Sequence, residues 1–599
     1  MLILGLSSLR HDPSAALIVD DTVTAAVEND KLSRSHTRGL PEVAIRFCLQ
    51  SAGVGWHDIG AVAVAARPIA ARPVQAWAYR AALQLRSALR AQIVSAYNEA
   101  NDIGNFARES NDLAILRQQC PTTRFFVWEH HLCHAATAFF LSPFDRSLII
   151  TLDENGDGNS GMIAIGEGSQ IRALHRIAFP HSIAWVYSQI TDLIGFVPRR
   201  EEHKTQWLSL ESEAAFKSVF VKMLRKPGSP LPHIDLTYFT RRAGRVTFSR
   251  KFYDETGIDP TAALNESHRR ELAASVQHAC TDLVNGLVEH FCRQQAVATV
   301  CLAGGLFQNA LLVANVERNL GINQVYVPPA PGNAGTAVGA GLLTWRSVNH
   351  ESRPQPLFSV YSGPKFSRHE IKEVLDNSKA RYSIENTQQR KIEAAVELLL
   401  AGKVIGWYQG ATEFGPRALG NRSVLASPWA EYVRENLNDF IKKREGFRPF
   451  AIAIPEEDCD RYFKASWLCR FMNSLSYVRS SNDCAVPANF LLAGNWIRLH
   501  VVQRSANPLF WRLLKGFGEH APAPMLVNTS FNLFGEPLVV TPRDAMRSFF
   551  CSGLDALIID NFVLSKSIWR AQIDRTELTC SAPTKPESAP RSSEIIFSK

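Results

Sequence analysis

The chain has 599 residues, of which 46% are hydrophobic and 20% are charged. One hydrophobic core rarely grows past about 250–300 residues, so this length predicts at least two cores. The composition is that of a globular protein and excludes a mainly disordered, collagen-like or coiled-coil chain. A net charge of +8 is mild for this length, and it fits an enzyme for phosphorylated substrates as well as weak nucleic-acid binding.

The cysteines and the first residues bear on the compartment. The eleven cysteines are scattered, and no two have C-x-x-C spacing, which favours a reducing, cytoplasmic environment. The first apolar segment is interrupted by Arg10, His11 and Asp12, where a signal peptide needs an apolar stretch. The uncharged residues 294–316 contain two adjacent glycines and several amides, which indicates a buried strand and turn rather than a membrane span. We therefore expect no membrane partner.

In chain order, the first predicted elements are two similar β-hairpins. Apolar residues 2–6 and 15–19 flank a polar turn, and residues 148–152 and 162–165 flank a loop rich in Asp and Gly. Two later strand-like segments each lead into a Gly-rich turn; they are residues 297–302 and 325–327. The repeated hairpin predicts a duplicated α/β unit with a cleft between the copies, although a large α/β protein could contain two unrelated hairpins.

Three segments set the predicted domain limits. Residues 67–90 carry five arginines and no acid; such a helix can contact nucleic acid, membrane or another subunit, and a solvated helix face is the interpretation we favour. The Pro-rich residues 351–365 predict a linker between a first domain, 1–350, and a second, 366–575. Residues 576–599 are rich in Ser and Pro and predict a disordered tail.

A metal site is predicted near the second hairpin. His130 and His134 stand at positions i and i+4, so a helix would place both imidazoles on one face. Asp153, at the end of a predicted strand, could add an oxygen ligand. A set of two His and one Asp suits Fe, Mn or Zn better than Mg. Most H-x-x-x-H pairs are incidental. The nearby hairpin that carries Asp153 is what strengthens the case for a metal site here.

Glycines at two predicted strand–helix turns indicate nucleotide binding. Without a Cβ, Gly304, Gly305, Gly332 and Gly335 would let backbone N–H groups approach a phosphate or ribose. Two such loops in one domain are what an adenylate would need, whereas a single glycine at such a turn is more often only a tight turn.

Cationic motifs dominate the second domain, at residues 413–423, 438–451 and 528–537. An Arg guanidinium group can bind two phosphate oxygens in a bidentate manner, and a Lys ammonium group adds a point charge. Phosphoryl and acyl-phosphate chemistry depends largely on positioning and electrostatic stabilisation. These cations lie among Gly, Pro and Phe rather than alternating with Glu, which counts against ordinary surface ion pairs. They predict a site for small phosphorylated substrates.

Taken together, these motifs resemble the O-carbamoyltransferase family, which includes nodulation and antibiotic-tailoring carbamoyltransferases. The resemblance rests on His11-Asp12 with Ser14, on residues 129–144, 302–315 and 328–342, and on the cationic motifs, and it covers residues 1 to about 565. It implies an α/β fold with a duplicated actin/Hsp70-like (ribonuclease-H-like) N-terminal domain, similar to the universal tRNA-threonylcarbamoylating protein, and a YrdC-like α/β C-terminal domain.

The resemblance also implies a two-step reaction. The second domain would make carbamoyl-adenylate from carbamoyl phosphate and ATP, with Mg for the ATP. The first domain would transfer the carbamoyl group to a hydroxyl of a small molecule, with a natural product as the expected acceptor class. His11 would be the base, and His130, His134 and Asp153 would bind a metal, with iron(II) expected.

The site residues implied by the resemblance fall into two groups. Lys442 and Arg498 are expected to be catalytic as well as substrate-binding. The whole set expected to bind the co-substrates and the adenylate is Lys204, Gly304, Gly305, Asn309, Gly332, Gly335, Arg417, Arg422, Lys442, Arg444, Arg448, Arg498, Asn528 and Ser530.

Two departures from the family pattern stand out. Family members usually have Asp as a fourth metal ligand where this chain has Asn333, and a neutral amide is the weaker ligand. The family often shows E-x-K-V-M-G-L-A where this chain has residues 202–209, with Trp207 in place of Gly. Lys204 remains as a phosphate contact, and the missing Gly predicts a reshaped acceptor or nucleotide pocket.

Other functions remain open. An actin-like small-molecule kinase would explain the Gly-rich loops and would produce ADP. A tRNA-modifying protein could use the basic residues 67–90, and salt-sensitive tRNA binding would support it; we place nucleic acid behind small phosphorylated substrates. A non-catalytic homologue, a homodimer and the identity of the acceptor also stay open.

Overall fold

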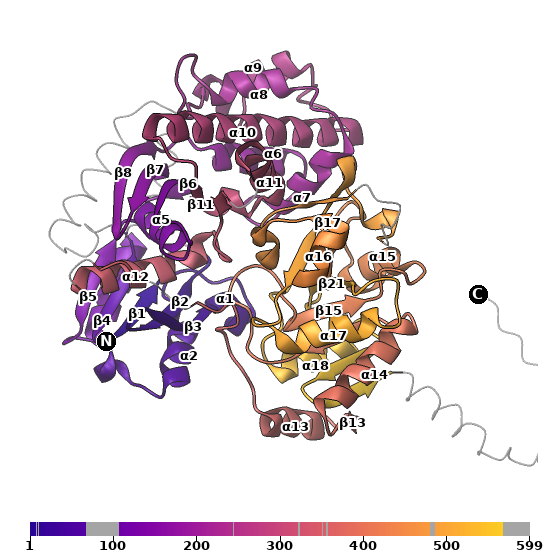
Figure 1. Cartoon of the computed structure of the whole chain (residues 1–599). Helices are drawn as coiled ribbons and strands as arrows, with labels where there is room; N and C mark the ends of the chain where they lie inside the picture. The colour runs from indigo at the N-terminus through magenta and orange to yellow at the C-terminus, as the bar shows by residue number, and fades with distance from the viewer. Residues whose placement is uncertain are drawn as a thin grey trace, which may run out of the picture.

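The computed structural model describes residues 1–566, apart from residues 8, 10, 67–106, 243–244, 322–323, 350–351, 355–357 and 480–485. The basic residues 67–90 and the predicted tail 576–599 therefore lie outside the described residues. Figure 1 shows the first domain as two sheets with helices around them and the second domain beside it. Within the described residues, no helix is both long and apolar enough to cross a membrane.

The first hairpin belongs to a five-stranded sheet. Its strands, in sheet order, are β3 (Thr22–Glu28), β2 (Ser14–Val19), β1 (Leu2–Leu6), β4 (Ala61–Ala65) and β5 (Arg124–Trp128). The first three strands pair antiparallel, and β1, β4 and β5 pair parallel. Residues on both faces of β1, β2 and β4 are buried, so this sheet needs a layer of helices on each side.

The second hairpin belongs to a sheet of the same design. Its strands, in sheet order, are β8 (Gln170–Ala178), β7 (Asn159–Glu167), β6 (Arg146–Gly156), β11 (Val300–Ala303) and β12 (Val325–Tyr326). Again the hairpin strands are antiparallel, and β6, β11 and β12 are parallel. Two sheets with one strand order and one set of directions confirm the predicted duplicated, actin/Hsp70-like α/β domain.

Two helices fill the space between the sheets. α5 (His130–Phe140) packs on β6 and β11, α12 (Thr336–Val348) packs on β1 and β4, and the helices pack on each other. Small residues allow this close approach: a Cβ on Gly339 would lie 2.0 Å from the Cys133 carbonyl oxygen. The runs of Ala and Gly that stand out in the sequence are therefore required by helix packing.

The outer helices of the first domain cover the remaining sheet faces. The 30-residue α10 (Glu266–Gln295) runs across the top of Figure 1 and packs with its neighbours into the core of the second sheet. Further helices include α1 (Asn29–Ser33), α2 (Glu42–Ala52), α6 (Ile183–Leu193), α7 (Glu202–Leu208), α8 (Lys217–Leu224), α9 (Arg250–Thr256) and α11 (Ala310–Leu320). A separate two-stranded sheet comprises β9 (Phe239–Arg242) and β10 (Arg245–Phe248).

The second domain contains an eight-stranded mixed sheet. Its strands, in sheet order, are β13 (Ser383–Ile384), β23 (Phe562–Ser565), β22 (Ala556–Ile559), β14 (Ile405–Tyr408), β15 (Arg422–Ala426), β21 (Leu526–Ser530), β16 (Ala451–Pro455) and β20 (Leu499–Val502). β17 (Phe463–Lys464), β18 (Ser476–Val478) and β19 (Trp496–Ile497) form a smaller sheet. The helices are α13 (Arg368–Asn377), α14 (Gln388–Leu400), α15 (Val433–Glu435), α16 (Glu456–Tyr462), α17 (Pro508–Gly518) and α18 (Pro542–Phe550).

Helices cover both faces of this sheet. α14 and α17 bury their apolar residues against one face, and α13 and α18 pack into the core on the other. A sheet buried on both faces with helices around it is the α/β arrangement predicted for this domain.

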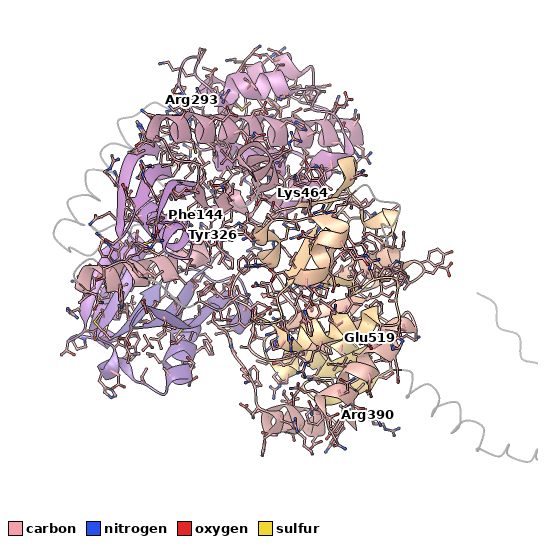
Figure 2. All side chains as sticks on the ribbon, viewed as in Figure 1. Phe144, Arg293, Tyr326, Arg390, Lys464 and Glu519 are labelled. Carbon is pink, nitrogen blue, oxygen red and sulfur yellow. The ribbon has the colours of Figure 1, made fainter. Side chains whose placement is uncertain are left out.

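Buried contacts hold the two domains together. Trp467, in the 3₁₀ turn η8 (Trp467–Phe471), packs against Phe144 and Tyr326 of the first domain, with ring centroids 5.8 and 5.7 Å away (Figure 2 labels both). Lys31 of α1 donates hydrogen bonds of 2.7 Å to the carbonyl oxygens of Glu413 and Gly415. The surfaces that carry the predicted substrate residues therefore meet at a fixed boundary.

Candidate active site

Three predicted metal ligands meet at the start of α5. His130 Nε2 lies 3.1 Å from His134 Nε2, and Asp153 Oδ2 lies 3.4 and 3.3 Å from these two nitrogens. An ion bound at about 2.0–2.2 Å holds neighbouring ligand atoms roughly 3–3.5 Å apart. All three residues are buried, and their ligand atoms fit a single metal ion.

Neighbouring residues give the three metal ligands room, and hydrogen bonds within the cluster keep Asp153 ionised. A Cβ on Gly156 would lie 2.0 Å from His130 Cδ2, so the tip of the second hairpin must be glycine. The Asp157 carboxylate accepts a hydrogen bond of 2.8 Å from the His130 backbone N–H and so caps the helix. Burial opposes ionisation of Asp153, but hydrogen bonds from His130 and His134 outweigh it and hold the pKa of Asp153 well below its usual range.

The neighbouring His131 has a different role. Its Nδ1 lies 2.9 Å from Thr151 Oγ1, and its Nε2 lies 3.1 Å from the Asn159 carbonyl oxygen. Burial, and then the nearby His130 and His134, lower the pKa of His131 to about 3. With both ring nitrogens bonded to protein, this neutral histidine fixes the hairpin against α5 and is not a ligand.

His11 and Asn333 lie together beside the metal cluster. The Asn333 side chain donates a hydrogen bond to the His11 carbonyl oxygen, while its Oδ1 is buried and has no partner. Ser14 Oγ donates to the Ala334 carbonyl oxygen at 2.7 Å and so joins the first hairpin to the same turn, η6 (Asn333–Gly335). An unpaired oxygen at this position fits a fourth ligand.

The His11 imidazole is half exposed and faces acids. Its Nδ1 lies 3.0 Å from Asp12 Oδ2, and 51% of the side chain is accessible to solvent. Partial burial lowers the pKa of His11, but the hydrogen bond and charge of Asp12 outweigh it, so the pKa is raised. A carboxylate on Nδ1 orients the ring and leaves Nε2 to exchange a proton with a ligand.

The predicted glycines lie where strands, turns and loops come closest. A Cβ on Gly304 would lie 2.1 Å from the Leu152 carbonyl oxygen, and one on Gly335 would lie 2.0 Å from that of Ala330. Gly305 begins the turn η5 (Gly305–Gln308) and faces the Asp153 carboxylate at 3.0 Å from its virtual Cβ. These glycines are needed for packing, whatever they contact in a ligand.

η5 connects the metal cluster to the second domain. At its end, the Gln308 carbonyl oxygen accepts a hydrogen bond of 3.2 Å from Arg417 Nη2. The Gln308 side chain also lies against Gly332, where a Cβ would be 2.4 Å from Nε2. The turn η5 therefore contacts both predicted glycine loops, Asp153 and Arg417.

Arg417 belongs to a cluster of half-buried and buried cations at the domain boundary, which we call the cation cluster. Its members are Arg417, Lys442, Arg444, Arg448 and Arg498. Burial lowers the pKa of Arg498 well below its usual range, and the charges of Arg417, Arg444 and Arg448 lower it further. Burial and Arg448 likewise lower the pKa of Arg417 to about 10. Like charges that depress each other must lie close together.

Few anions balance this charge. Glu445 lies 3.8 Å from Arg448 and 2.6 Å from Lys204. Lys442 bonds the Ser530 backbone carbonyl and lies 2.8 Å from Asn532 Oδ1, both neutral groups. Arg417 Nε and Arg498 Nε are buried without a hydrogen-bond partner. Because a buried N–H group of a cation without a partner is costly, the cluster could accommodate an anion.

Three residues predicted to bind ligands are bonded to protein instead. Arg422 is fully buried and donates to the carbonyl oxygens of Gln409, Gly410 and Asn421 at 2.5–3.1 Å. Lys204 Nζ is held between Glu201 and Glu445, at 2.7 and 2.6 Å. These two cations therefore shape the site and join the domains rather than offering free charge to a phosphate.

The third such residue is Asn309. It caps α11 through Oδ1 and bonds Gln277 at 2.7 Å. Asn528, in contrast, keeps a buried and unpaired Oδ1, although its Nδ2 lies 3.0 Å from His500 Nδ1. Asn528 thus remains available to a ligand.

Sequence reasoning gave no site role to Glu413 and His203, and it named Trp207 only as the residue in place of the family glycine. The buried Glu413 carboxylate accepts backbone N–H bonds of 2.8–3.1 Å from Leu419, Asn421 and Arg422, and so shapes the Arg417 loop. A buried acid followed by a Gly-rich loop was the signal for it. Trp207 and His203 of α7 face the cation cluster. The Trp207 ring lies 5.5 Å from the Arg498 guanidinium of the second domain, and His203 Nε2 has no hydrogen-bond partner.

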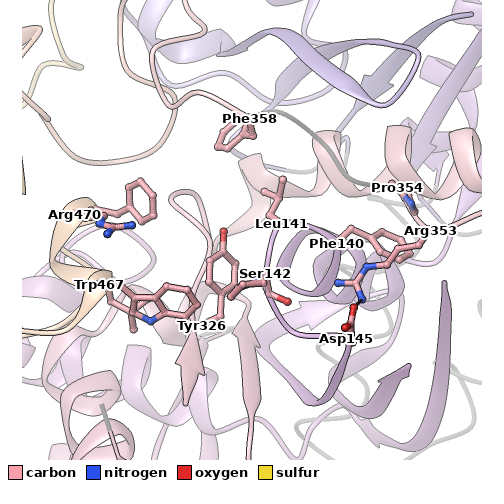
Figure 3. Close-up of a pocket in the computed structure, with 13 residues that line it drawn as sticks. Phe140, Leu141, Ser142, Asp145, Tyr326, Arg353, Pro354, Phe358, Trp467 and Arg470 are labelled. Carbon is pink, nitrogen blue, oxygen red and sulfur yellow. Dashed lines mark hydrogen bonds and ion pairs between the residues drawn. The ribbon is translucent and has the colours of Figure 1, made fainter. Parts of the chain in front are cut away.

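A cavity lies elsewhere on the domain boundary. It has a volume of about 500 Å³ and is lined by aromatic residues that include Tyr326, Phe358 and Trp467 (Figure 3). Its two arginines are paired, Arg353 with Asp145 at 3.0 Å and Arg470 with Glu456 at 2.5 Å. It therefore lacks the unbalanced charge of the cation cluster and is not a phosphate site.

Comparisons with known proteins match both domains. The carbamoyltransferase N-terminus model matches residues 2–342, and the carbamoyltransferase C-terminus model matches residues 396–566. The chain is 30% identical to an uncharacterized protein of Synechocystis sp., over 94% of this chain and 97% of that one, and 30% identical to nodulation protein NolNO of Sinorhizobium fredii, over 94% and 80%. It is also 30% identical to a 3'-hydroxymethylcephem-O-carbamoyltransferase of Amycolatopsis lactamdurans, over 40% and 43%. These matches confirm the predicted family. The chain belongs to the carbamoyltransferase family and is a carbamoyl-transferring enzyme.

Proposed function

We propose that this enzyme makes carbamoyl-adenylate from carbamoyl phosphate and ATP at the cation cluster and then transfers the carbamoyl group to a hydroxyl of a small molecule. A natural product is the acceptor class we favour, because the chain is similar to a cephem O-carbamoyltransferase. The observation that supports the proposal is the cation cluster, whose charge is only partly balanced by carboxylates of the described residues and in which two guanidinium Nε atoms have no partner.

The first step suits this electrostatic environment. Water hydrolyses carbamoyl phosphate to carbamate and inorganic phosphate. A carbamate oxygen then attacks the α-phosphorus of ATP, and pyrophosphate leaves. Negative charge accumulates on the phosphates throughout, and Mg would accompany the ATP. Arg417, Arg448 and Arg498 would neutralise that charge, and Lys442 would add a point charge among neutral neighbours. Preorganised cations need little rearrangement during the reaction.

The second step needs a base and an activated acyl group. His11, oriented by Asp12, would take the proton of the acceptor hydroxyl while its oxygen attacks the carbamoyl carbon and AMP leaves. General-base assistance is worth about 10²–10⁴-fold. His130, His134, Asp153 and Asn333 would hold a metal ion, for which we propose iron(II). Such an ion supplies a Lewis acid or an anchor for the adenylate.

The position of η5 supports a single path between the two steps. One end of this turn borders Asp153, and its other end bonds Arg417 through Gln308. An intermediate made at the cation cluster would therefore reach the metal cluster by crossing one short turn. A reactive mixed anhydride gains protection from water when its path is short and buried.

The nucleotide products test this proposal. Incubation with ATP, labelled carbamoyl phosphate, Mg and iron(II) should release AMP and pyrophosphate and form labelled carbamoyl-adenylate. Production of ADP instead would indicate a kinase and would contradict the proposal. Omission of carbamoyl phosphate is the control, because pyrophosphate release must depend on it.

A further inference from the structure

The short helix α7 presents one face to the cation cluster. His203 and Trp207 are four residues apart in it, so their side chains share a face. The Trp207 ring lies 5.5 Å from the Arg498 guanidinium, and Lys204 Nζ, next along the helix, lies 2.6 Å from Glu445. These two contacts with the second domain place His203 at the edge of the same charged site.

The His203 ring carries an unused acceptor. Its Nε2 is buried and has no hydrogen-bond partner. Burial, and then the charges of Arg448, Arg417 and Lys204, lower the pKa of His203 to about 3, so the ring is neutral. The Arg200 backbone acts on the ring in the direction that raises the pKa, and because Nε2 has no partner this favours the ring proton on the other nitrogen. Nε2 therefore holds a lone pair and accepts hydrogen bonds.

A neutral acceptor among cations favours a particular part of a ligand. The arginines and lysines near His203 are donors only, and they satisfy phosphate and carbonyl oxygens. Their N–H groups leave a donor on the ligand without a partner. Carbamoyl phosphate has one such donor, its NH₂ group, because its ionised phosphate and its carbonyl oxygen are acceptors. Acetyl phosphate has a methyl group in that place.

We propose that His203 Nε2 accepts a hydrogen bond from the NH₂ group of carbamoyl phosphate and so makes the enzyme select carbamoyl phosphate over acetyl phosphate. This inference rests on the proposed function of the cation cluster as the carbamoyl phosphate site. A site with a buried acceptor rejects an analogue that lacks the donor, because the acceptor is then left unpaired.

The test compares the two acyl phosphates in one assay. Pyrophosphate release from ATP gives the KM for carbamoyl phosphate, and competition gives the inhibition constants of acetyl phosphate and inorganic phosphate. His203→Leu should raise the KM for carbamoyl phosphate by about 10- to 100-fold and leave both inhibition constants nearly unchanged. His203→Gln, which keeps an acceptor, should retain part of the preference. His290→Leu, at an exposed position of α10, is the matched control.

The outcomes separate this inference from the proposed function. If His203→Leu keeps the wild-type preference, or weakens carbamoyl phosphate and acetyl phosphate equally, His203 does not read the NH₂ group and the inference is wrong. A wild-type enzyme that releases no pyrophosphate with carbamoyl phosphate overturns the proposed function and the inference with it. Selective loss of carbamoyl phosphate, with partial recovery in His203→Gln, supports both.

Discussion

Ser474 of the second domain donates its hydroxyl hydrogen bond to the carboxyl group of Glu317 in α11 of the first domain. Both residues are buried, and Glu317 Oε1 has no hydrogen-bond partner. Burial raises the pKa of Glu317 to about 7, even though the serine hydroxyls of Ser474 and Ser466 lower it. The folded domain boundary therefore favours the protonated, neutral form of the Glu317 carboxyl group.

This contact predicts a stability that falls as the pH rises. Between an ordinary pKa of about 4.5 and the folded value of about 7, the folded protein keeps a proton that the unfolded chain releases. Each pKa unit corresponds to about 1.4 kcal/mol, so the free energy of unfolding should drop by about 3 kcal/mol across this range. Glu317→Gln should remove that drop. The variant should have a free energy of unfolding similar to that of the wild type near pH 4.5 and a higher one at pH 8.

Denaturation midpoints at several pH values measure the effect. The control is Glu373→Gln, which makes the same change at an exposed position of α13 and should follow the wild-type curve. Parallel curves for wild type and Glu317→Gln would show that Glu317 titrates alike in the folded and unfolded chain.

Asn333→Asp should tighten metal binding. A carboxylate adds charge to a ligand set that now has an unpaired amide oxygen, so affinity should rise by roughly tenfold. Without metal the variant should melt lower than wild type, because Asp cannot donate to the His11 carbonyl oxygen as Asn333 does. Thermal melts and chelator competition, with and without iron(II), measure both effects.

The control for this experiment is Asn377→Asp, at an exposed position of α13. It should change neither the apo melting temperature nor the metal-dependent shift. An Asn333→Asp protein with wild-type metal affinity would place Asn333 outside the ligand set.

Arg422→Lys should cost stability rather than substrate affinity. The guanidinium bonds several backbone carbonyls and stacks 3.6 Å from the Tyr408 ring, and a lysine cannot reproduce that fork. We expect a loss of about 2–4 kcal/mol in the free energy of unfolding. The KM for carbamoyl phosphate of the folded fraction should not change. Arg390→Lys, an exposed change on α14, is the control.

A raised KM with unchanged stability in Arg422→Lys would return this residue to the ligand-binding set. Urea denaturation and pyrophosphate release on the same preparation distinguish the two results.

The features that the sequence predicts are local ones. The i, i+4 spacing of His130 and His134, the repeated hairpin and the Gly-rich turns each depend on neighbours in the chain, and the structure forms each of them. Partners across the domain boundary could not be predicted in this way. Lys204 has the residue type of a phosphate contact, yet Glu445, far along the chain, holds its ammonium group.

The same limit explains Arg422 and His203. Arg422 stands in an Arg-rich motif, but whether it faces a ligand or the core depends on which side of β15 it occupies, and it lies inside. His203 is close to a ligand site because Arg417 and Arg448 of the other domain lie near it, as their effect on its pKa shows. Burial and interdomain contact, rather than residue type, decide which cations of such a motif remain free.

The most direct test of the division of labour between the two sites is to measure carbamoyl-adenylate formed from ATP and labelled carbamoyl phosphate by His11→Asn and Arg498→Ala. His11→Asn should form carbamoyl-adenylate and pyrophosphate as wild type does but fail to pass the carbamoyl group to a hydroxyl. Arg498→Ala should form neither product, because it removes a half-buried cation at the centre of the cluster's mutual repulsion. Loss of adenylate formation in both variants, or its survival in Arg498→Ala, would contradict the account.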